Sequence, residues 1–472
     1  MKNRLLAMAV MMSVLVIGRP AAAQTRVIVR DTGGLLGIQN SCTKVGCTVN
    51  HGLDGTVGQL YLVTPNQQPP RGLLGDLLGT VFNLLDFLTK LLLQPGVTNA
   101  EPDQLLNLTQ SQSLAAPPGL WDTTPVNYYG TTVWDGYVSQ PAVQIVNLTS
   151  ARSAFRVTGA GVVGMIDTGV DPTHPALKAV LLQGYDFTRN QPGGSEMSDV
   201  NQSTMAVVNR GAAYDPAQVN QSTMAVVNRS AAPAQLNQST MAVVNQEDAT
   251  DLQSSQYADF GHGTMTAGIV HLVAPTAQIL PLKAFGPDGT GYLSSIISAV
   301  YWGTQHGANV LSMSFDFTTP SKEMAQAINY AAAQGVVSVA SVGNNGQRML
   351  VYPAALPSVM GVASVSDTET LSTFSNFGAP PVWVAAPGEG IITTYPFGTY
   401  AAGWGTSFST PFVAGTAALF RSATLPLLRP VNLGLNQSLA AQSIAHAQRV
   451  CGNQCGNGVL DIYQAIDSWG GL

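Results

Sequence analysis

The sequence contains few charged residues and few cysteines. Only 10% of the residues are Asp, Glu, Lys or Arg, and the net charge is −6. No run of Lys or Arg occurs, so we expect no nucleic-acid partner, because such partners are bound through basic patches. Hydrophobic residues make up 45% of the chain, a share typical of a compact globular protein.

The four cysteines form two close pairs, Cys42 with Cys47 and Cys451 with Cys455. In an oxidising compartment each pair can close a small local disulfide loop. A zinc site shared by the four thiols is the alternative, but the pairs lie at opposite ends of the chain.

The first residues have the pattern of a secretory signal. Lys2 and Arg4 precede the apolar stretch Leu5–Ile17, and small residues follow at Ala21–Ala23. The apolar stretch is short for a bilayer span, which favours a cleaved signal at residues 1–23 over a retained anchor. We therefore expect a secreted protein without a stable membrane anchor, released outside the cell or into a periplasm.

Residues 24–110 have the pattern of a small α+β domain. Arg26–Arg30 and Leu60–Thr64 are strand-like, and Leu73–Leu93 is an apolar segment with one polar stripe at helical spacing. A transmembrane helix is the alternative for that segment, but its three charges make this costly. From Leu114 to Pro125 the chain is rich in Ala, Pro, Gly and Thr, which predicts an exposed linker at residues 111–128.

In residues 129–472, short apolar segments alternate with helical ones. This alternation predicts an α/β fold with a doubly wound, mostly parallel sheet, helices on both faces and a site at the carboxyl ends of the strands. The expected strands are Gly161–Ile166, Ile279–Leu282, Val310–Met313, Val336–Ala340, Met360–Val365 and Val382–Ala385, and the expected helices are Ser294–His306, Lys322–Gln334 and Thr410–Arg421.

A repeat-containing insertion interrupts this alternation at about residues 195–250. A nine-residue sequence at Asn201–Asn209 recurs at Asn220–Asn228 and Asn237–Asn245. Three units this short are marginal for a solenoid. We interpret them as a duplicated surface insertion, with a flap or exosite near a substrate cleft as the alternative.

Three separate motifs carry the residue types of a serine hydrolase. Asp167 stands in Val-Gly-Met-Ile-Asp-Thr-Gly, His262 in Gly-His-Gly-Thr, and Ser407 in Gly-Thr-Ser-Phe-Ser-Thr-Pro. The order acid, base, nucleophile is the order found in subtilisin. Around these motifs, from about Ala151 to Ala465, the chain resembles the subtilases, the subtilisin-like serine proteases.

The resemblance implies a role for each motif residue. Ser407 is the expected nucleophile, with Ser409 as a rival two residues later. His262 is the expected general base, and Asp167 orients its imidazole ring. Asn344, in Ser-Val-Gly-Asn-Asn-Gly, matches the asparagine that donates to the oxyanion in the family, although Asn-Asn-Gly is also a common turn sequence.

Substrate contacts follow from the same resemblance. Ser312 and Ser314, in Ser-Met-Ser-Phe-Asp, align with the strand edge that pairs with substrate backbone, and Asp316 replaces a usual glycine there. Val351 occupies a position at the base of the primary pocket that is often smaller. We therefore expect a shallow apolar pocket.

The segment Gln94–Asp103 resembles the closing strand of a subtilase propeptide. The resemblance implies that residues 24–110 assist folding and then inhibit the protease as its own propeptide, with processing between Asp103 and Tyr128. No cofactor is required for the expected chemistry. Structural calcium is an open expectation, with Asp186, Asp199 and Asp215 as candidate ligands.

The sequence therefore predicts a secreted, monomeric serine endopeptidase that acts on polypeptides. Two alternatives stay open. One is a subtilase-like binding protein that has lost activity, since Trp404 before the Ser407 motif is unusual. The other is a surface interaction protein that processes only itself and binds a partner through the repeats.

Overall fold

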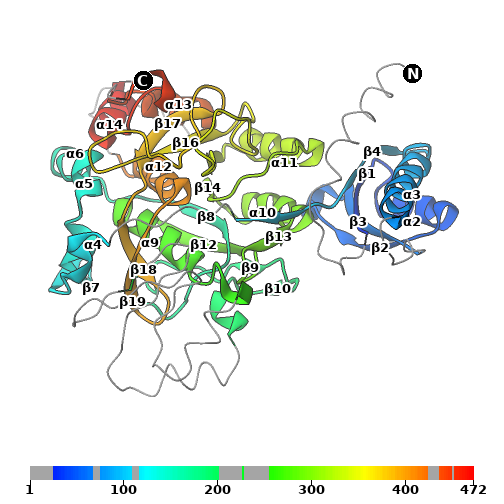
Figure 1. The fold of residues 1–472 in the computed structure, drawn as a ribbon, viewed down its shortest axis with the longest axis horizontal. Helices are drawn as coiled ribbons and strands as arrows, with labels where there is room; N and C mark the ends of the chain where they lie inside the picture. The colour runs from blue at the N-terminus through cyan, green and yellow to red at the C-terminus, as the bar shows by residue number, and fades with distance from the viewer. Residues whose placement is uncertain are drawn as a thin grey trace. The chain divides into compact units, whose positions relative to one another are not determined.

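The computed structural model describes residues 25–66, 75–108, 116–200, 226–227, 255–423, 435–448 and 451–471. The chain divides into two compact units, one made chiefly of residues up to Leu105 and one that begins at Leu106 (Figure 1). The expected signal at residues 1–23 and nearly all of the repeat insertion lie outside the described residues.

The N-terminal unit is a four-stranded antiparallel sheet with two helices, in the strand order β2-β3-β1-β4. Alternate residues of its central strand, Val27 and Val29, are fully buried and pack with Ile38 and Leu91 of the helices. The predicted strands and helix are therefore present. The elements are β1 Val27–Asp31, α2 Gly34–Val45, β2 Cys47–Gly52, η1 Gly55–Val57, β3 Leu60–Pro65, α3 Gly75–Leu92 and β4 Val97–Pro102.

All four cysteines are in local disulfides, Cys42–Cys47 and Cys451–Cys455. The disulfide prediction is confirmed and the shared zinc site is wrong. Within the described residues, no helix has the length and apolar character needed to cross a bilayer.

The second unit contains an eight-stranded sheet in the order β10-β9-β12-β8-β14-β15-β16-β17. Every neighbouring pair is parallel except β9 with β10, which confirms the mostly parallel sheet. The strands are β8 Val162–Asp167, β9 Tyr185–Asp186, β10 Gln191–Pro192, β12 Gln278–Lys283, β14 Val310–Met313, β15 Val337–Ser341, β16 Met360–Val365 and β17 Val382–Pro387.

Both faces of this sheet are covered. All four residues of β14 are buried, and successive strand residues point to opposite faces. The helices are α9 His262–Val273, α10 Leu293–Gln305, α11 Lys322–Ala333, α12 Thr406–Phe420, α13 Gln437–Ile444 and α14 Ile462–Gly471.

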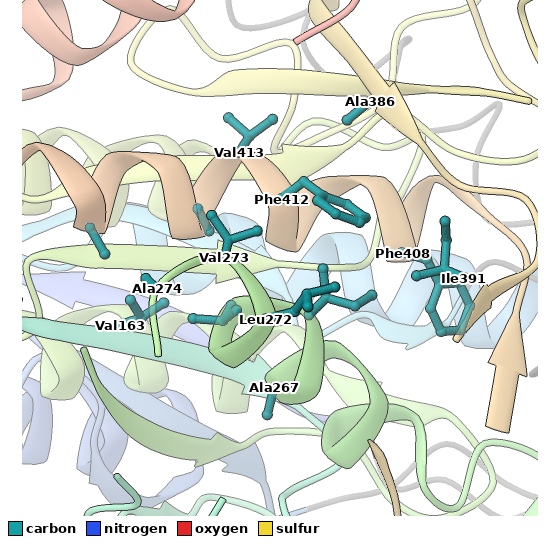
Figure 2. Packing of buried hydrophobic residues seen from close by; sticks show 14 of the residues in the cluster. Val163, Ala267, Leu272, Val273, Ala274, Ala386, Ile391, Phe408, Phe412 and Val413 are labelled. Carbon is teal, nitrogen blue, oxygen red and sulfur yellow. The ribbon is translucent and has the colours of Figure 1, made fainter. Parts of the chain in front are cut away.

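Helices α9 and α12 are buried along their whole length, and apart from His262 and His271 of α9 their residues are apolar or small. Figure 2 shows the cluster to which α9 contributes Leu272 and Val273 and α12 contributes Phe408 and Phe412. A Cβ atom at Gly415 would lie 2.6 Å from the Cβ of Val273, so glycine is needed for the close helix contact.

The expected linker at 111–128 is only partly a linker. Leu120, in the short helix η2 Pro118–Trp121, is fully buried, and β6 Pro125–Tyr128 forms a hairpin with β7 Thr131–Trp134. The prediction is therefore wrong for residues 116–128, because this Pro- and Gly-rich stretch contains apolar side chains that are buried in the second unit.

Smaller elements complete the second unit. Val226–Val227 (β11), within the second repeat, pair with Ala402 and Ala401 of β19. The remaining elements are β5 Leu105–Asn107, α4 Asp135–Val138, α5 Pro141–Ile145, α6 Leu148–Phe155, η3 Glu196–Asp199, η4 Ser255–Tyr257, β13 Thr290–Tyr292, β18 Ile391–Tyr395, β19 Thr399–Gly403 and η5 Gly452–Cys455.

The order of the central strands locates a site. From β8 the chain continues to β12 on one side and later to β14 on the other, so the winding direction changes at β8. In open α/β sheets, ligands bind beside the carboxyl ends of the strands at such a point. Asp167 is the last residue of β8.

Candidate active site

The side chain of Asp167 is buried and accepts hydrogen bonds on both oxygens. Its Oδ1 accepts from the Thr168 amide at 2.7 Å and lies 2.7 Å from Nδ1 of His262, and its Oδ2 accepts from the Thr266 hydroxyl at 3.0 Å. Three donors therefore fix this carboxylate in position.

His262 is the first residue of α9, and the glycines beside it allow its close approach to β8. Gly261 has φ of +93°, and a Cβ there would lie 2.4 Å from the Tyr395 ring. A Cβ at Gly263 would lie 1.9 Å from the carbonyl oxygen of Gly169. The Gly-His-Gly sequence is thus required by packing as well as by the motif.

The contact with Asp167 changes the basicity of His262. Burial alone would lower the pKa of His262, but the charge of Asp167 and its hydrogen bond to the ring outweigh burial and hold that pKa above its usual range. A stronger base is better able to take a proton from a hydroxyl group.

Ser407 is the second residue of α12, which begins at Thr406 and not at Thr410 as expected. Pro411 therefore lies inside the helix and not in its first turn. The Phe408 ring centroid is 5.8 Å from that of His262, which brings the start of α12 to the His262 ring. Helix N-termini also favour negative charge, as an oxyanion would carry.

Asn344 follows β15 and reaches the same helix start. Its Oδ1 accepts from the Thr406 amide and from the Thr406 hydroxyl, both at 2.9 Å. The remaining polar group of the side chain is the amide nitrogen, which is a donor. Asn344 is therefore bound directly beside Ser407.

Of the expected substrate-contact residues, the structure brings Ser314 to Ser407 but not Ser312. The Ser314 hydroxyl donates to the main-chain oxygen of Ser407 at 2.9 Å. Ser312 lies inside β14, between β8 and β15, and is 1% exposed. Val351 is fully buried beside Tyr352, which pairs with Phe317.

Asp316 stands close to the loop that carries Asn344. Its Oδ2 would lie 2.9 Å from a Cβ built on Gly343. The carboxyl group thus packs against the residue before Asn344, at a place where the family resemblance implies glycine.

Two of the predicted calcium ligands form ion pairs with basic side chains. Asp186 binds Arg189 at 2.8 Å, and Asp199 binds Arg189 at 2.6 Å and the fully buried Lys283 at 2.8 Å. Asp215 lies outside the described residues. Within the described ranges, no group of three or more His, Cys, Asp or Glu side chains is arranged to hold a metal ion.

Sequence analysis missed one buried acid at this site, Glu196. Its carboxyl group contacts Thr168, Gly261 and Thr264, which are neighbours of Asp167 and His262. No motif surrounds Glu196 in the sequence, and only the fold brings it to this position.

A doubly wound α/β domain with an Asp–His pair beside a serine at a helix start has the arrangement found in serine hydrolases. The sequence profile of the subtilase family matches residues 159–458, more than half of the chain. The chain belongs to the subtilase family.

Known relatives are similar over part of the chain. Subtilisin BL from Lederbergia lenta is 38% identical over 170 residues, which cover 34% of this chain and 63% of the relative. Thermitase from Thermoactinomyces vulgaris is 38% identical over 185 residues, which cover 37% of this chain and 66% of the relative. The chain thus spans less than two thirds of the length of these relatives.

A solved structure is similar over nearly the whole chain. Fervidolysin from Fervidobacterium pennivorans, described as a keratinolytic enzyme related to subtilisin, aligns with a TM-score of 0.63 and 18% identity. The alignment covers 96% of this chain and 62% of fervidolysin. At this identity the similarity shows the fold alone.

Proposed function

We propose that the protein is a secreted serine endopeptidase that hydrolyses polypeptides through an acyl-enzyme on Ser407. The observation that carries the proposal is the 2.7 Å contact between Asp167 and His262, together with the contact of the His262 ring with Phe408 in the helix that bears Ser407. This pair supplies a base of raised pKa close to the helix start that carries Ser407.

In the proposed reaction, His262 takes the proton of the Ser407 hydroxyl as its oxygen attacks the carbonyl carbon of the scissile bond. The oxyanion that forms accepts hydrogen bonds from the Ser407 amide and the Asn344 side chain. When the C–N bond breaks, the leaving amine takes the proton from His262. Water then attacks the acyl-enzyme with the same base, which releases the acid and restores Ser407.

The Ser407 hydroxyl has to turn before this reaction. It donates to the main-chain oxygen of Ser314 at 3.1 Å. Catalytic hydrogen bonds are often long or misdirected without substrate, so a substrate that pairs near Ser314 would release the hydroxyl toward His262.

We further propose that residues 24–110 are an inhibitory propeptide. Strand β5 pairs with β13, and the Leu108 amide donates to the Gly289 carbonyl at 2.9 Å. On the other side, Leu120 is buried in the second unit. Leu108 and Leu120 are thus both in contact with the rest of the second unit. These contacts support processing within residues 109–115, which lie between the two segments.

The proposal is tested with the full precursor and its Ser407→Ala variant. Intact mass and N-terminal sequencing follow processing, and unfolded casein serves as substrate. We expect the parent to lose its N-terminal unit at residues 109–115 and to digest casein, and the variant to do neither. If the parent only processes itself, the self-processing interaction protein is supported. If neither precursor changes and neither cleaves casein, the inactive binding protein is supported.

A further inference from the structure

Glu196 is a fully buried acid whose side chain lies between the segments that carry Asp167 and His262. Its Oε2 accepts from the Gly261 amide at 2.8 Å and from the Thr168 hydroxyl at 3.2 Å. Its Oε1 accepts a hydrogen bond from the hydroxyl of Thr264.

Both threonines extend this contact to the main chain. The Thr168 hydroxyl accepts from the Gly263 amide at 2.9 Å. The Thr264 hydroxyl accepts from the Asp171 amide at 2.8 Å. Glu196 therefore joins the end of β8 and the turn that follows it to the first turn of α9.

The main chain around Glu196 also contacts the turn after β8. The Val170 amide donates to the Gly194 carbonyl at 2.9 Å. A Cβ built on Gly169 would lie 2.7 Å from the Glu196 nitrogen, so the two segments are in direct contact. Nearby, Lys283 binds the Thr168 carbonyl at 2.6 Å.

We propose that Glu196 is a positioning residue that fixes the distance and angle between Asp167 and His262. Its carboxyl group binds the residue after the acid and the residue before the base, so it sets the separation of β8 and α9 at the point where these two side chains meet. This inference rests on the proposed roles of Asp167, His262 and Ser407.

The charge state of Glu196 decides which substitution can replace it. Burial raises the pKa of Glu196 to about 8, against the opposing effects of its hydrogen bonds and of Lys283, while the charge of Asp171 raises it further. At neutral pH the carboxyl group is thus mostly protonated, and Oε2 is the oxygen that accepts from Gly261 and Thr168. The charged or titratable groups that interact with it are Lys283, Asp171 and His262.

A glutamine has the same shape and the same pattern of hydrogen bonds as a protonated glutamate. Its oxygen can accept from Gly261 and Thr168, and its NH2 group can donate to Thr264. Glu196→Gln should therefore preserve the positioning, whereas Glu196→Ala removes it.

The test measures kcat and KM between pH 5 and 9 for both variants, per active site titrated with an irreversible serine reagent. We expect Glu196→Ala to lower kcat about tenfold to a hundredfold with little change in KM, as for a small misplacement of reacting groups. The acid limb of kcat/KM should also move to lower pH, because a loosened Asp167 no longer holds up the pKa of His262 and the smaller raising effect of Glu196 on that pKa is lost. Glu196→Gln should restore kcat.

Asp461→Asn is the matched control. This buried carboxylate accepts from Asn147 and from the Gln464 amide, and not from the segments around Asp167 and His262. It should lower Tm without changing the pH profile. If Glu196→Ala behaves like this control, Glu196 only stabilises the fold and the inference is overturned. If Glu196→Ala does not fold, the Thr264→Val variant is measured in its place. A Thr264→Val variant with the kcat and pH profile of the wild-type protein would overturn the inference. Activity in Ser407→Ala would instead overturn the proposed function.

Discussion

Ser314 and Ser407 exchange two hydrogen bonds. The Ser314 hydroxyl donates to the Ser407 carbonyl at 2.9 Å, and the Ser407 hydroxyl donates to the Ser314 carbonyl at 3.1 Å. Pro411 explains the first bond, because it lies four residues after Ser407 and has no N–H for the helix ladder. Ser314 supplies the missing donor and thereby ties the end of β14 to the nucleophile helix.

Ser314→Ala should therefore lower the free energy of unfolding by about 1–3 kcal/mol, the cost of a buried carbonyl without a donor. The measurement is urea unfolding in the Ser407→Ala background, which prevents self-digestion. Pro411→Ala provides the matched test, since it returns an N–H to the same carbonyl. The double variant should lose less stability than the two single changes added together, and simple additivity would contradict the account.

Asn344→Ala should lower kcat about a hundredfold to a thousandfold with KM nearly unchanged. That loss is the known cost of removing one oxyanion donor, measured in subtilisin itself. Steady-state hydrolysis of a chromogenic peptide gives both constants. Asn345→Ala is the neighbouring control, because Asn345 contacts Asn376 and not the start of α12. Equal losses in the two variants would count against the oxyanion role.

Val351→Ala should widen the primary pocket if this buried side chain forms its base. We compare kcat/KM for a substrate with Phe before the cleaved bond and for one with Ala at that position. The Phe-to-Ala ratio of these values should rise about tenfold, the size of effect expected when a pocket changes by a few methylene groups. Val143→Ala, at a buried position in α5, controls for lost packing. An unchanged ratio would mean that Val351 does not face the substrate.

His271 should make the fold sensitive to acid. Burial, with the nearby charges of His174 and Arg152, lowers the pKa of His271 to about 3. The unfolded chain binds this proton below about pH 6.5, and the folded chain does so only near pH 3, so stability falls as the pH drops through that window.

His271→Gln in the Ser407→Ala background should weaken the dependence of unfolding free energy on pH between about 6.5 and 4, measured in urea. Glutamine keeps a polar group near the Tyr137 hydroxyl, which lies 3.2 Å from Nδ1 of His271. His306→Gln, at an exposed position, serves as control. The same slope in all three proteins would contradict the prediction.

The strands and helices of the second unit were largely predictable because their sequence patterns are local. An apolar run such as Val310–Met313 is explained by burial on both faces of a parallel sheet, and β14 has those bounds. The motifs around Asp167 and His262 were equally clear, since each glycine there is required by a close contact.

The errors concern features that depend on long-range contacts. Glu196 is 65 residues from Gly261, the amide it binds, so no local pattern could identify it. Helix α12 begins at Thr406 and not at the predicted Thr410. Pro411 is typical of a first helical turn, but here the Ser314 hydroxyl, 93 residues from Ser407 in sequence, replaces the missing N–H. The sequence predicts substrate contacts for both Ser312 and Ser314, but Ser312 lies inside β14 and only Ser314 lies beyond its end.

The most direct test is to locate the adduct of a phosphonofluoridate, which phosphonylates an activated serine much faster than an ordinary hydroxyl group. The labelled protein is digested and mapped by mass spectrometry, with His262→Ala as the comparison. We predict one adduct, on Ser407, that is absent in His262→Ala. An adduct on Ser409, or digestion of casein by a protein that takes up no label at Ser407, would contradict the assignment of the nucleophile.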